Sequence, residues 1–184
     1  TATNSTGTSA ASSASNSVSP TTWATGNYES IATVTVGSGG SSSVSFTSIP
    51  STYTHLQVRA TLRGTSALGE VNCESRFNSD SGSNYSRHQL YGDGSAAGAT
   101  ATTSSTIMVV GSVPDSSKSA NIFGSFVLDI LDYTNTNKYK TTRTLYGYDA
   151  NGSGIIILRS NLWMSTSAIS SISFSPASNN WAQY

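Results

Sequence analysis

The sequence predicts an all-β protein: a jelly-roll-like antiparallel β-sandwich with an extended N-terminal arm. Apolar residues alternate with polar residues at a spacing of two along most of the chain, which is typical of strands with one buried face. Turn signals separate roughly nine or ten such segments, and no stretch shows a helical period. About a third of the 184 residues are Ser or Thr and only 10% are charged. This composition favours a surface that faces other protein surfaces or glycans.

Residues 1–27 are expected to form the arm, and residues 28–184 the sandwich domain. The arm contains no charged residue, and its Ser, Thr, Ala, Asn and Gly content is typical of flexible linkers. Ordering its backbone would cost about 1–2 kcal/mol per residue, which Trp23 alone cannot offset. Fully extended, the arm would reach about 90 Å, beyond its own domain. We therefore expect it to lie on a neighbouring subunit, with packing on its own domain as the alternative. The expected subunit-contact residues are Val18, Pro20, Trp23 and Tyr28.

Six strands are expected in the first two thirds of the chain, at residues 32–36, 44–46, 55–63, 71–77, 85–91 and 106–110. The clearest lies at 55–63, where Leu56 and Val58 alternate with His55, Gln57 and Arg59. Such alternation predicts one face against a core and the other in water.

Four further strands are expected at residues 122–131, 138–148, 155–164 and 172–174. The first is apolar on both faces except for Ser125 and Asp129, which indicates a central strand or a subunit interface. The second and third are predicted to pair as a hairpin, because Asn151-Gly152 between them is a strong signal for a tight turn.

The charge balance excludes several function classes. Nine basic residues balance nine acidic ones, and no basic run is present that could neutralise phosphates, so we expect no nucleic-acid partner. No apolar stretch is long enough to span a membrane. Cys73 is the single cysteine, so it predicts neither an internal disulfide nor a zinc site. We expect no cofactor.

Neither histidine is a good catalytic candidate. The sequence contains no nucleophile elbow, phosphate-binding loop or zinc-protease motif. His55 lies on the polar face of its predicted strand beside Arg59, and His88 lies between Arg87 and Gln89. We therefore expect both histidines to be solvated or to lie in an interface.

The acidic pairs are equally weak as candidates. Glu70 and Glu74 would share one strand face and could imitate a carboxylate pair, whereas Asp129 and Asp132 would point to opposite faces. Neither pair has a suitable acid or base partner, so we expect surface or interface groups. The sequence therefore predicts no catalytic residue and a protein that is not an enzyme.

One loop resembles an oxygen-rich calcium loop, because Asn78, Asp80, Gly82 and Asn84 alternate in it. It lacks the closing glutamate and has a single carboxylate, so an Asx-type turn between two strands is the preferred interpretation. Asp93 is likewise expected in a turn. No metal site is predicted.

Aromatic residues leave a second function open. Exposed Trp and Tyr often bind sugars in jelly rolls, and the chain has three Trp and nine Tyr. Trp163, however, lies in a segment with an apolar pattern, so we expect it to be buried. Sequons for N-linked glycans occur at Asn4, Asn84 and Asn151, and the arm composition would also suit O-linked glycans.

Several segments resemble a family of bacteriophage virion structural proteins of the tail-fibre or head-decoration type. They are YESI at 28–31, VSFTSIPSTYTHL at 44–56, RFNSDSGSNYS at 76–86, LYG at 90–92, DYTNTNKYKT at 132–141 and WMSTSAI at 163–169. The resemblance implies a β-sandwich module displayed on virion surfaces, without catalysis. The arm at 1–27 has no counterpart in that module.

The resemblance also departs from the family at its end. Family members continue past a position like Trp181 into a closing apolar strand, whereas this sequence stops at Tyr184. Either the sequence is truncated or the sandwich lacks its last strand and has an open edge, which would accept a strand from another subunit.

The expected function is therefore structural. The chain is predicted to self-assemble through its arm, as a virion appendage or decoration or as an extracellular filament, in contact with other virion proteins or cell-surface glycans. The alternative function is a glycan-binding, receptor-binding module of a phage fibre. The expected location is the virion surface or the extracellular space.

Overall fold

The computed structural model describes residues 3–4, 7–8 and 28–184, in two units, Thr1–Ile31 and Ala32–Tyr184. In the first unit, the short strands β1 (Thr3–Asn4) and β2 (Gly7–Thr8) pair antiparallel. The rest of the predicted arm lies outside the described residues. So do three of its expected contact residues, Val18, Pro20 and Trp23, while Tyr28 is exposed.

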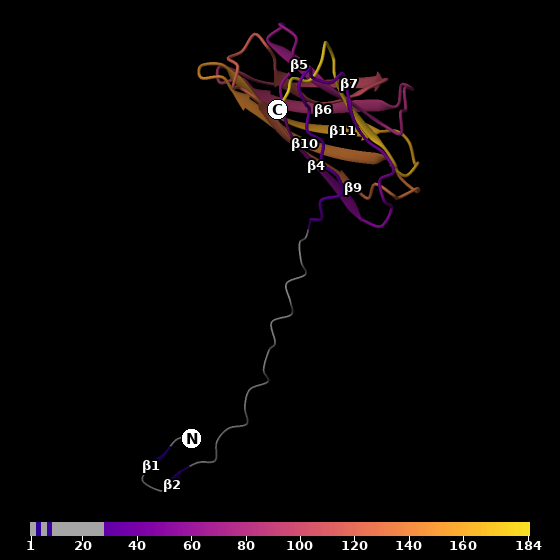
Figure 1. Cartoon of the computed structure of the whole chain (residues 1–184). Coiled ribbons are helices and arrows are strands. Elements are labelled where there is room, and N and C mark those ends of the chain that lie inside the picture. Colours follow the sequence, from indigo (N-terminus) through magenta and orange to yellow (C-terminus); the bar gives the residue numbers. More distant parts are fainter. Residues whose placement is uncertain (1–2, 5–6, 9–27) are drawn as a thin grey trace. The chain divides into compact units, whose positions relative to one another are not determined.

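The second unit is an antiparallel β-sandwich, which confirms the predicted fold class (Figure 1). Its described residues contain no helix, and so none that could span a bilayer. The strands are β3 (Val44–Phe46), β4 (His55–Leu62), β5 (Glu70–Phe77), β6 (Tyr85–Gly92), β7 (Ala97–Ser105), β8 (Met108–Pro114), β9 (Gly124–Leu131), β10 (Lys140–Asp149), β11 (Gly154–Trp163) and β12 (Ile172–Pro176).

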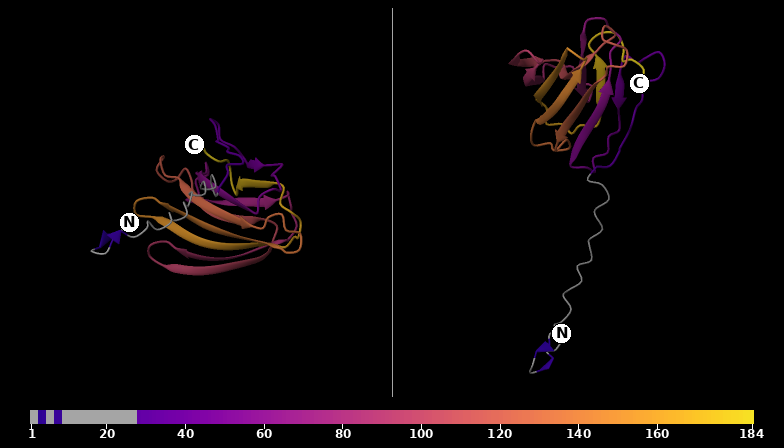
Figure 2. Two further views of the ribbon diagram at one scale, coloured as in Figure 1. Left: turned by 90° about the horizontal axis from the view of Figure 1, so that it is seen from below. Right: turned by 90° about the vertical axis from the view of Figure 1, so that its left-hand side faces the viewer.

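The strand order is that of a jelly roll with one insertion. One sheet has the order β4-β9-β10-β11-β6-β7 and the other β3-β12-β5-β8, and the two pack face to face (Figure 2). Without the hairpin β10–β11, the first sheet would read β4-β9-β6-β7, which together with the second sheet is the order of an eight-stranded jelly roll. The hairpin therefore widens the middle of one sheet.

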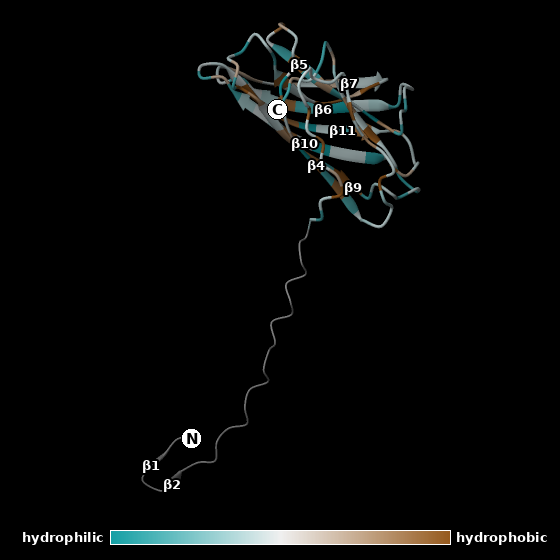
Figure 3. Ribbon diagram, viewed as in Figure 1, coloured by the Kyte–Doolittle hydropathy of each residue, from teal (hydrophilic) through white to brown (hydrophobic). Residues whose placement is uncertain are grey.

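The core lies between the sheets, where alternate residues of the strands meet. Figure 3 shows hydrophobic and hydrophilic residues interspersed along the strands. Phe77 and Trp163 pack edge to face with ring centroids 5.5 Å apart. Trp163 is 2% exposed, as predicted, and Leu128 and Ile130 of β9 are fully buried. Burial of such side chains is the main favourable contribution to folding.

One predicted strand is absent, and one observed strand was not predicted. Residues 32–36 form no strand, because alternation alone does not supply a pairing partner. Val34 is half exposed, and only Val36 packs into the core. Conversely, β7 was not predicted, since its Ala, Gly, Thr and Ser residues show no apolar alternation. The predicted strand at 106–110 begins at Met108.

Two other predictions are confirmed. The strand β9 lies inside the six-stranded sheet, between β4 and β10. The hairpin turn is tight: the Ala150 N–H donates to the Ser153 carbonyl over 2.7 Å. Asn151 and Gly152 have φ values of 53° and 115°, in the left-handed region that their residue types tolerate best.

The C-terminal residues contact two loops of the sandwich, the loop before β3 and the loop between β4 and β5. Trp181 is fully buried and forms isolated β-bridges with Ser41 and Gly64. The neighbouring strand β12 lies inside the four-stranded sheet, between β3 and β5. Both alternatives for the end of the sequence stay predictions.

Candidate functional site

The outer face of the six-stranded sheet carries a line of aliphatic side chains. In the strand register, Val127 of β9 lies opposite Leu145 of β10, Leu145 opposite Leu158 of β11, and Leu158 opposite Leu90 of β6. Each of these residues alternates along its strand with core residues, so all four point away from the core. Leu90, Leu145 and Leu158 are 60%, 54% and 53% exposed. We call these four residues the aliphatic row.

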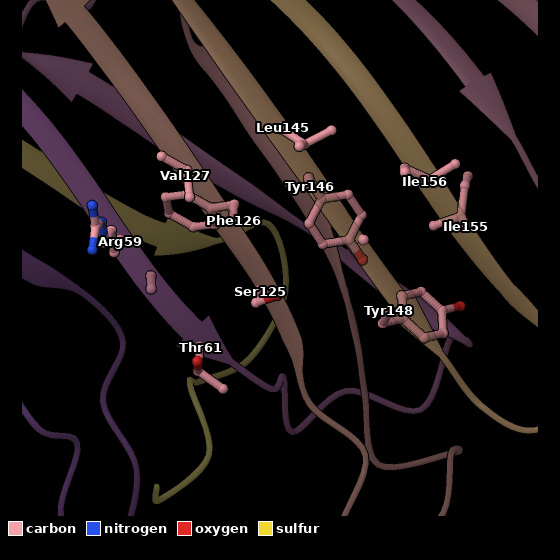
Figure 4. Close-up of a pocket in the computed structure, with 12 residues that line it drawn as sticks. Arg59, Thr61, Ser125, Phe126, Val127, Leu145, Tyr146, Tyr148, Ile155 and Ile156 are labelled. Atoms are coloured by element: carbon pink, nitrogen blue, oxygen red, sulfur yellow. The ribbon is translucent and has the colours of Figure 1, made fainter.

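A shallow depression adjoins the aliphatic row. In the next cross-strand line, Gly147 lies between Ser125 and Ile156, and its missing side chain leaves the sheet surface open there. Ile156 is 60% exposed. The depression has a volume of about 670 Å³, and residues of β4, β9, β10 and β11 line it (Figure 4). Its outward-pointing lining residues are Arg59, Thr61, Ser125, Val127, Leu145, Gly147 and Ile156.

The charges of this face lie on one half of the sheet. The Gln57 side chain donates to Asp129 over 2.8 Å and accepts from Arg59 over 2.6 Å. Arg143 of β10 lies directly opposite Asp129 in the register. The outward positions of β11, β6 and β7 hold no Asp, Glu, Lys or Arg; His88 is the titratable group among them. The face is thus aliphatic in its middle and of mixed charge at one side.

A buried arginine supports the sheet from the inside. Arg159 of β11 is 3% exposed and donates from Nε and Nη2 to the Gln89 side chain over 2.9 and 2.6 Å. Its Nη1 donates to the Val109 carbonyl of β8 over 2.8 Å. Burial, together with nearby Arg87, lowers the pKa of Arg159 to about 10. These bonds hold β11 against β6 and β8, so we assign Arg159 a structural role.

The two histidines lie in separate places. The amide of Asp132 donates to His55 Nδ1 over 3.0 Å, and Lys138 bonds to the Asp132 carboxylate. The hydrogen bond from Lys138 lowers the pKa of Asp132. His88 is exposed on the outer face.

Glu70 and Glu74 have different partners. Glu70 accepts a 2.6 Å hydrogen bond from the Tyr148 hydroxyl, and the charged group next to Glu74 is Arg76. Burial raises the pKa of Glu74. In the described part of the chain, no three His, Cys, Asp or Glu residues are grouped as a metal ion would need.

The loop that resembled a calcium site is an Asx-type turn, as predicted. The Asp80 carboxylate accepts hydrogen bonds from the Gly82 amide over 2.8 Å, the Asn84 side chain over 2.9 Å and the Trp163 indole over 2.7 Å. The turn prediction for Asp93 is also confirmed, since its carboxylate accepts from the Ser95 and Ala96 amides.

Two of the three tryptophans are unsuited to the glycan-binding alternative. Trp163 and Trp181 are buried, so neither offers a stacking surface. Large exposed aromatic side chains are Tyr28, Tyr139 and Tyr184. Glycan binding stays an untested prediction.

Sequence reasoning missed the aliphatic row, because its members come from four separate segments and only the register unites them. The local signal is a run that is apolar on both faces, as in residues 122–131 and in Ile155-Ile156-Ile157-Leu158. Comparison of the chain with models of known protein families, with curated protein sequences and with solved structures finds no match. The resemblance to virion proteins therefore stays a prediction.

Proposed function

We propose that this chain is a non-enzymatic structural protein whose copies assemble with one another, as part of a virion appendage or decoration or as the subunit of an extracellular filament. The observation that carries the proposal is the aliphatic row. Leu90, Leu145 and Leu158 are each more than half exposed, although they lie next to one another in the middle of a sheet. Contiguous exposed apolar surface on a folded protein marks an interaction site.

A second copy of the chain fits this face. Asp129 and Arg143 lie side by side next to the aliphatic row, so the face carries both signs of charge. A copy related by a two-fold axis would present the same pair in the opposite order and could match each charge with its opposite. Aliphatic side chains of two such faces would pack as the inner faces of a sandwich do.

The free energy that this contact can supply indicates that a second contact is needed as well. Burying the exposed half of a leucine side chain gains about 1 kcal/mol, so the row and Ile156 of the two copies together gain roughly 10 kcal/mol. Association itself costs about 4–15 kcal/mol. The aliphatic row alone would therefore give a weak contact, and we propose that the N-terminal arm supplies the additional one, through Val18, Pro20, Trp23 and Tyr28.

The test compares assembly of the full chain with that of Leu158→Glu. A glutamate at this position would place charge between Leu145 and Leu90 and would have to be desolvated on assembly. We expect the unchanged chain to form oligomers or filaments in sedimentation velocity and negative-stain electron microscopy, and Leu158→Glu to shift toward the monomer by at least about tenfold in apparent affinity.

Leu68→Glu is the matched control. Leu68 is 74% exposed and lies in a loop outside both sheets, so the same substitution there adds the same charge away from the row. Circular dichroism would verify that both variants fold. A chain that stays monomeric over all accessible concentrations would refute the proposed function. If both variants assembled equally well, the aliphatic row would not be part of the contact between copies.

A further inference from the structure

The strand β7 forms an open edge of the six-stranded sheet, because it pairs with β6 on one side only. Its nine residues include no charged residue and no proline. Both faces of the strand are accessible: Ala99 and Ala101 are exposed on one face and Thr100 on the other. A long, uncharged and exposed edge is a template for another strand.

The other edges of the sandwich are protected. The strand β4, at the opposite edge of the same sheet, carries His55 and Arg59. The edge strand β3 has only three residues. Every residue of the edge strand β8 is buried. Among the described strands, β7 is therefore the one edge that is long, uncharged and exposed.

The backbone of β7 is regular over a useful length. Its register with β6 is uninterrupted from Ala97 to Thr102, and the bulge comes only after that, where Ser104 has a φ of 53°. The Tyr91 ring packs directly on Gly98, where an added Cβ would lie 2.5 Å from the tyrosine hydroxyl. Six regular residues equal the length of a typical strand, so a full partner strand fits.

The uncharged N-terminal segment has the chemistry of a partner for this edge. Residues 9–27 consist mainly of Ser, Thr, Ala and Asn, which are also the kinds of small side chain that β7 presents. A strand that pairs along β7 gains main-chain hydrogen bonds and needs no apolar face, because both faces of β7 are open to water. The aliphatic row, in contrast, needs apolar cover, which this segment supplies poorly.

The place of Val36 in the second unit favours pairing between copies. The Val36 carbonyl accepts from the Tyr184 amide, and the Ala182 amide donates to the Arg63 carbonyl just after β4. Val36 thus lies on the β4 side of the sandwich, whereas β7 is the opposite edge of that sheet. Five strand spacings separate these edges, about 24 Å. A copy that donates at one edge and accepts at the other would form an open, head-to-tail array.

We propose that β7 receives a strand from residues 9–27 of a second copy of this chain, an inference that rests on the proposed self-assembly. Each copy would donate one strand and accept one. The six-stranded sheet would then gain a seventh strand from its neighbour, and the assembly would grow as a linear filament.

Disulfide trapping between two populations of the full chain tests the inference. One population carries Ala99→Cys in β7, and the other carries Ser12→Cys, Ser15→Cys or Ser17→Cys, three donor positions because the register is not known. The native Cys73 is fully buried and does not compete. The matched control acceptor is Thr61→Cys, which is exposed on β4 at the opposite edge.

Pairing would hold the two thiols at a local concentration of about 1 mM, against about 10 µM in the mixed solution. We therefore expect mixed disulfides between the donors and Ala99→Cys, identified by intact mass, to form about 100-fold faster than those with Thr61→Cys. Assembly in sedimentation without trapping at Ala99→Cys would overturn this inference and leave the proposed function standing. If a chain that carries both cysteines forms only an intramolecular disulfide, this inference is also overturned. Absence of assembly would refute both.

Discussion

The indole N–H of Trp163 donates a 2.7 Å hydrogen bond to the carboxylate of Asp80, which lies 83 residues earlier in the chain. Through this bond the loop between β5 and β6 is attached to the end of β11. The same carboxylate closes its own turn by accepting from Gly82 and Asn84. The hydrogen bond from Trp163 lowers the pKa of Asp80, and those from Asn84 and Gly82 act in the same direction.

We expect Asp80→Ala to lower the free energy of unfolding by about 1–3 kcal/mol, because it leaves the buried Trp163 N–H without an acceptor. Denaturant unfolding followed by tryptophan fluorescence would measure the change. Asp93→Ala is the control: Asp93 also closes a turn, but its carboxylate bonds only to Ser95 and Ala96 beside it. Equal losses from both substitutions would show that the contact with Trp163 contributes nothing.

The fold class was predictable because alternation and turn chemistry are local signals. Asn151-Gly152 specified its turn through left-handed backbone preference, and Leu56 and Val58 marked the inward face of β4. The failures have equally local causes. Residues 32–36 alternate but have no neighbouring strand, and β7 pairs through its main chain with side chains too small to leave a pattern.

The candidate site was far less predictable. Val127, Leu145, Leu158 and Leu90 are adjacent only because the hairpin β10–β11 is inserted between β9 and β6. No sequence spacing encodes that insertion. A segment that is apolar on both faces does reveal that its outer face is unusual, and it was the single signal that pointed to this surface.

Asp115 makes stability dependent on pH in the acid range. It is fully buried and accepts hydrogen bonds from Ser66, Leu68, Gly69 and Ser117. Burial acts to raise the pKa of Asp115, but the hydrogen bonds, first that from Ser117, outweigh it and lower the pKa from 3.8 to about 2. Because the folded-state pKa is the lower one, the stabilisation is complete above about pH 4 and is lost as the pH falls toward 2.

Urea unfolding at pH 7, 4 and 2.5 would measure this dependence. We expect the free energy of unfolding to fall more steeply with acidification in the unchanged chain than in Asp115→Asn, which cannot take up the proton. The difference between the two curves isolates Asp115 from the other carboxylates. Parallel curves between pH 4 and pH 2.5 would contradict the assignment.

Two adjacent glycines lie in the loop that forms hydrogen bonds with the C-terminal residues. Substituting each of them distinguishes the cost of backbone strain from the cost of a steric clash. Gly39 and Gly40 have φ values of 95° and 75°, so a side chain at either position is strained. An added Cβ at Gly39 meets nothing within 4 Å, whereas one at Gly40 would clash with the Trp181 carbonyl oxygen. That oxygen accepts from the Ser41 amide over 3.1 Å, and the Trp181 amide donates back to Ser41 over 2.7 Å.

We expect Gly39→Ala to cost about 1 kcal/mol of unfolding free energy, the usual strain of a left-handed alanine. Gly40→Ala should cost at least about 2 kcal/mol more, because the methyl group must displace the main chain of Trp181. Hydrogen exchange of the Ser41 and Trp181 amides should accelerate in Gly40→Ala and stay unchanged in Gly39→Ala. Similar losses in both variants would show that the loop can move away from Trp181, and that the C-terminal bridges do not hold it.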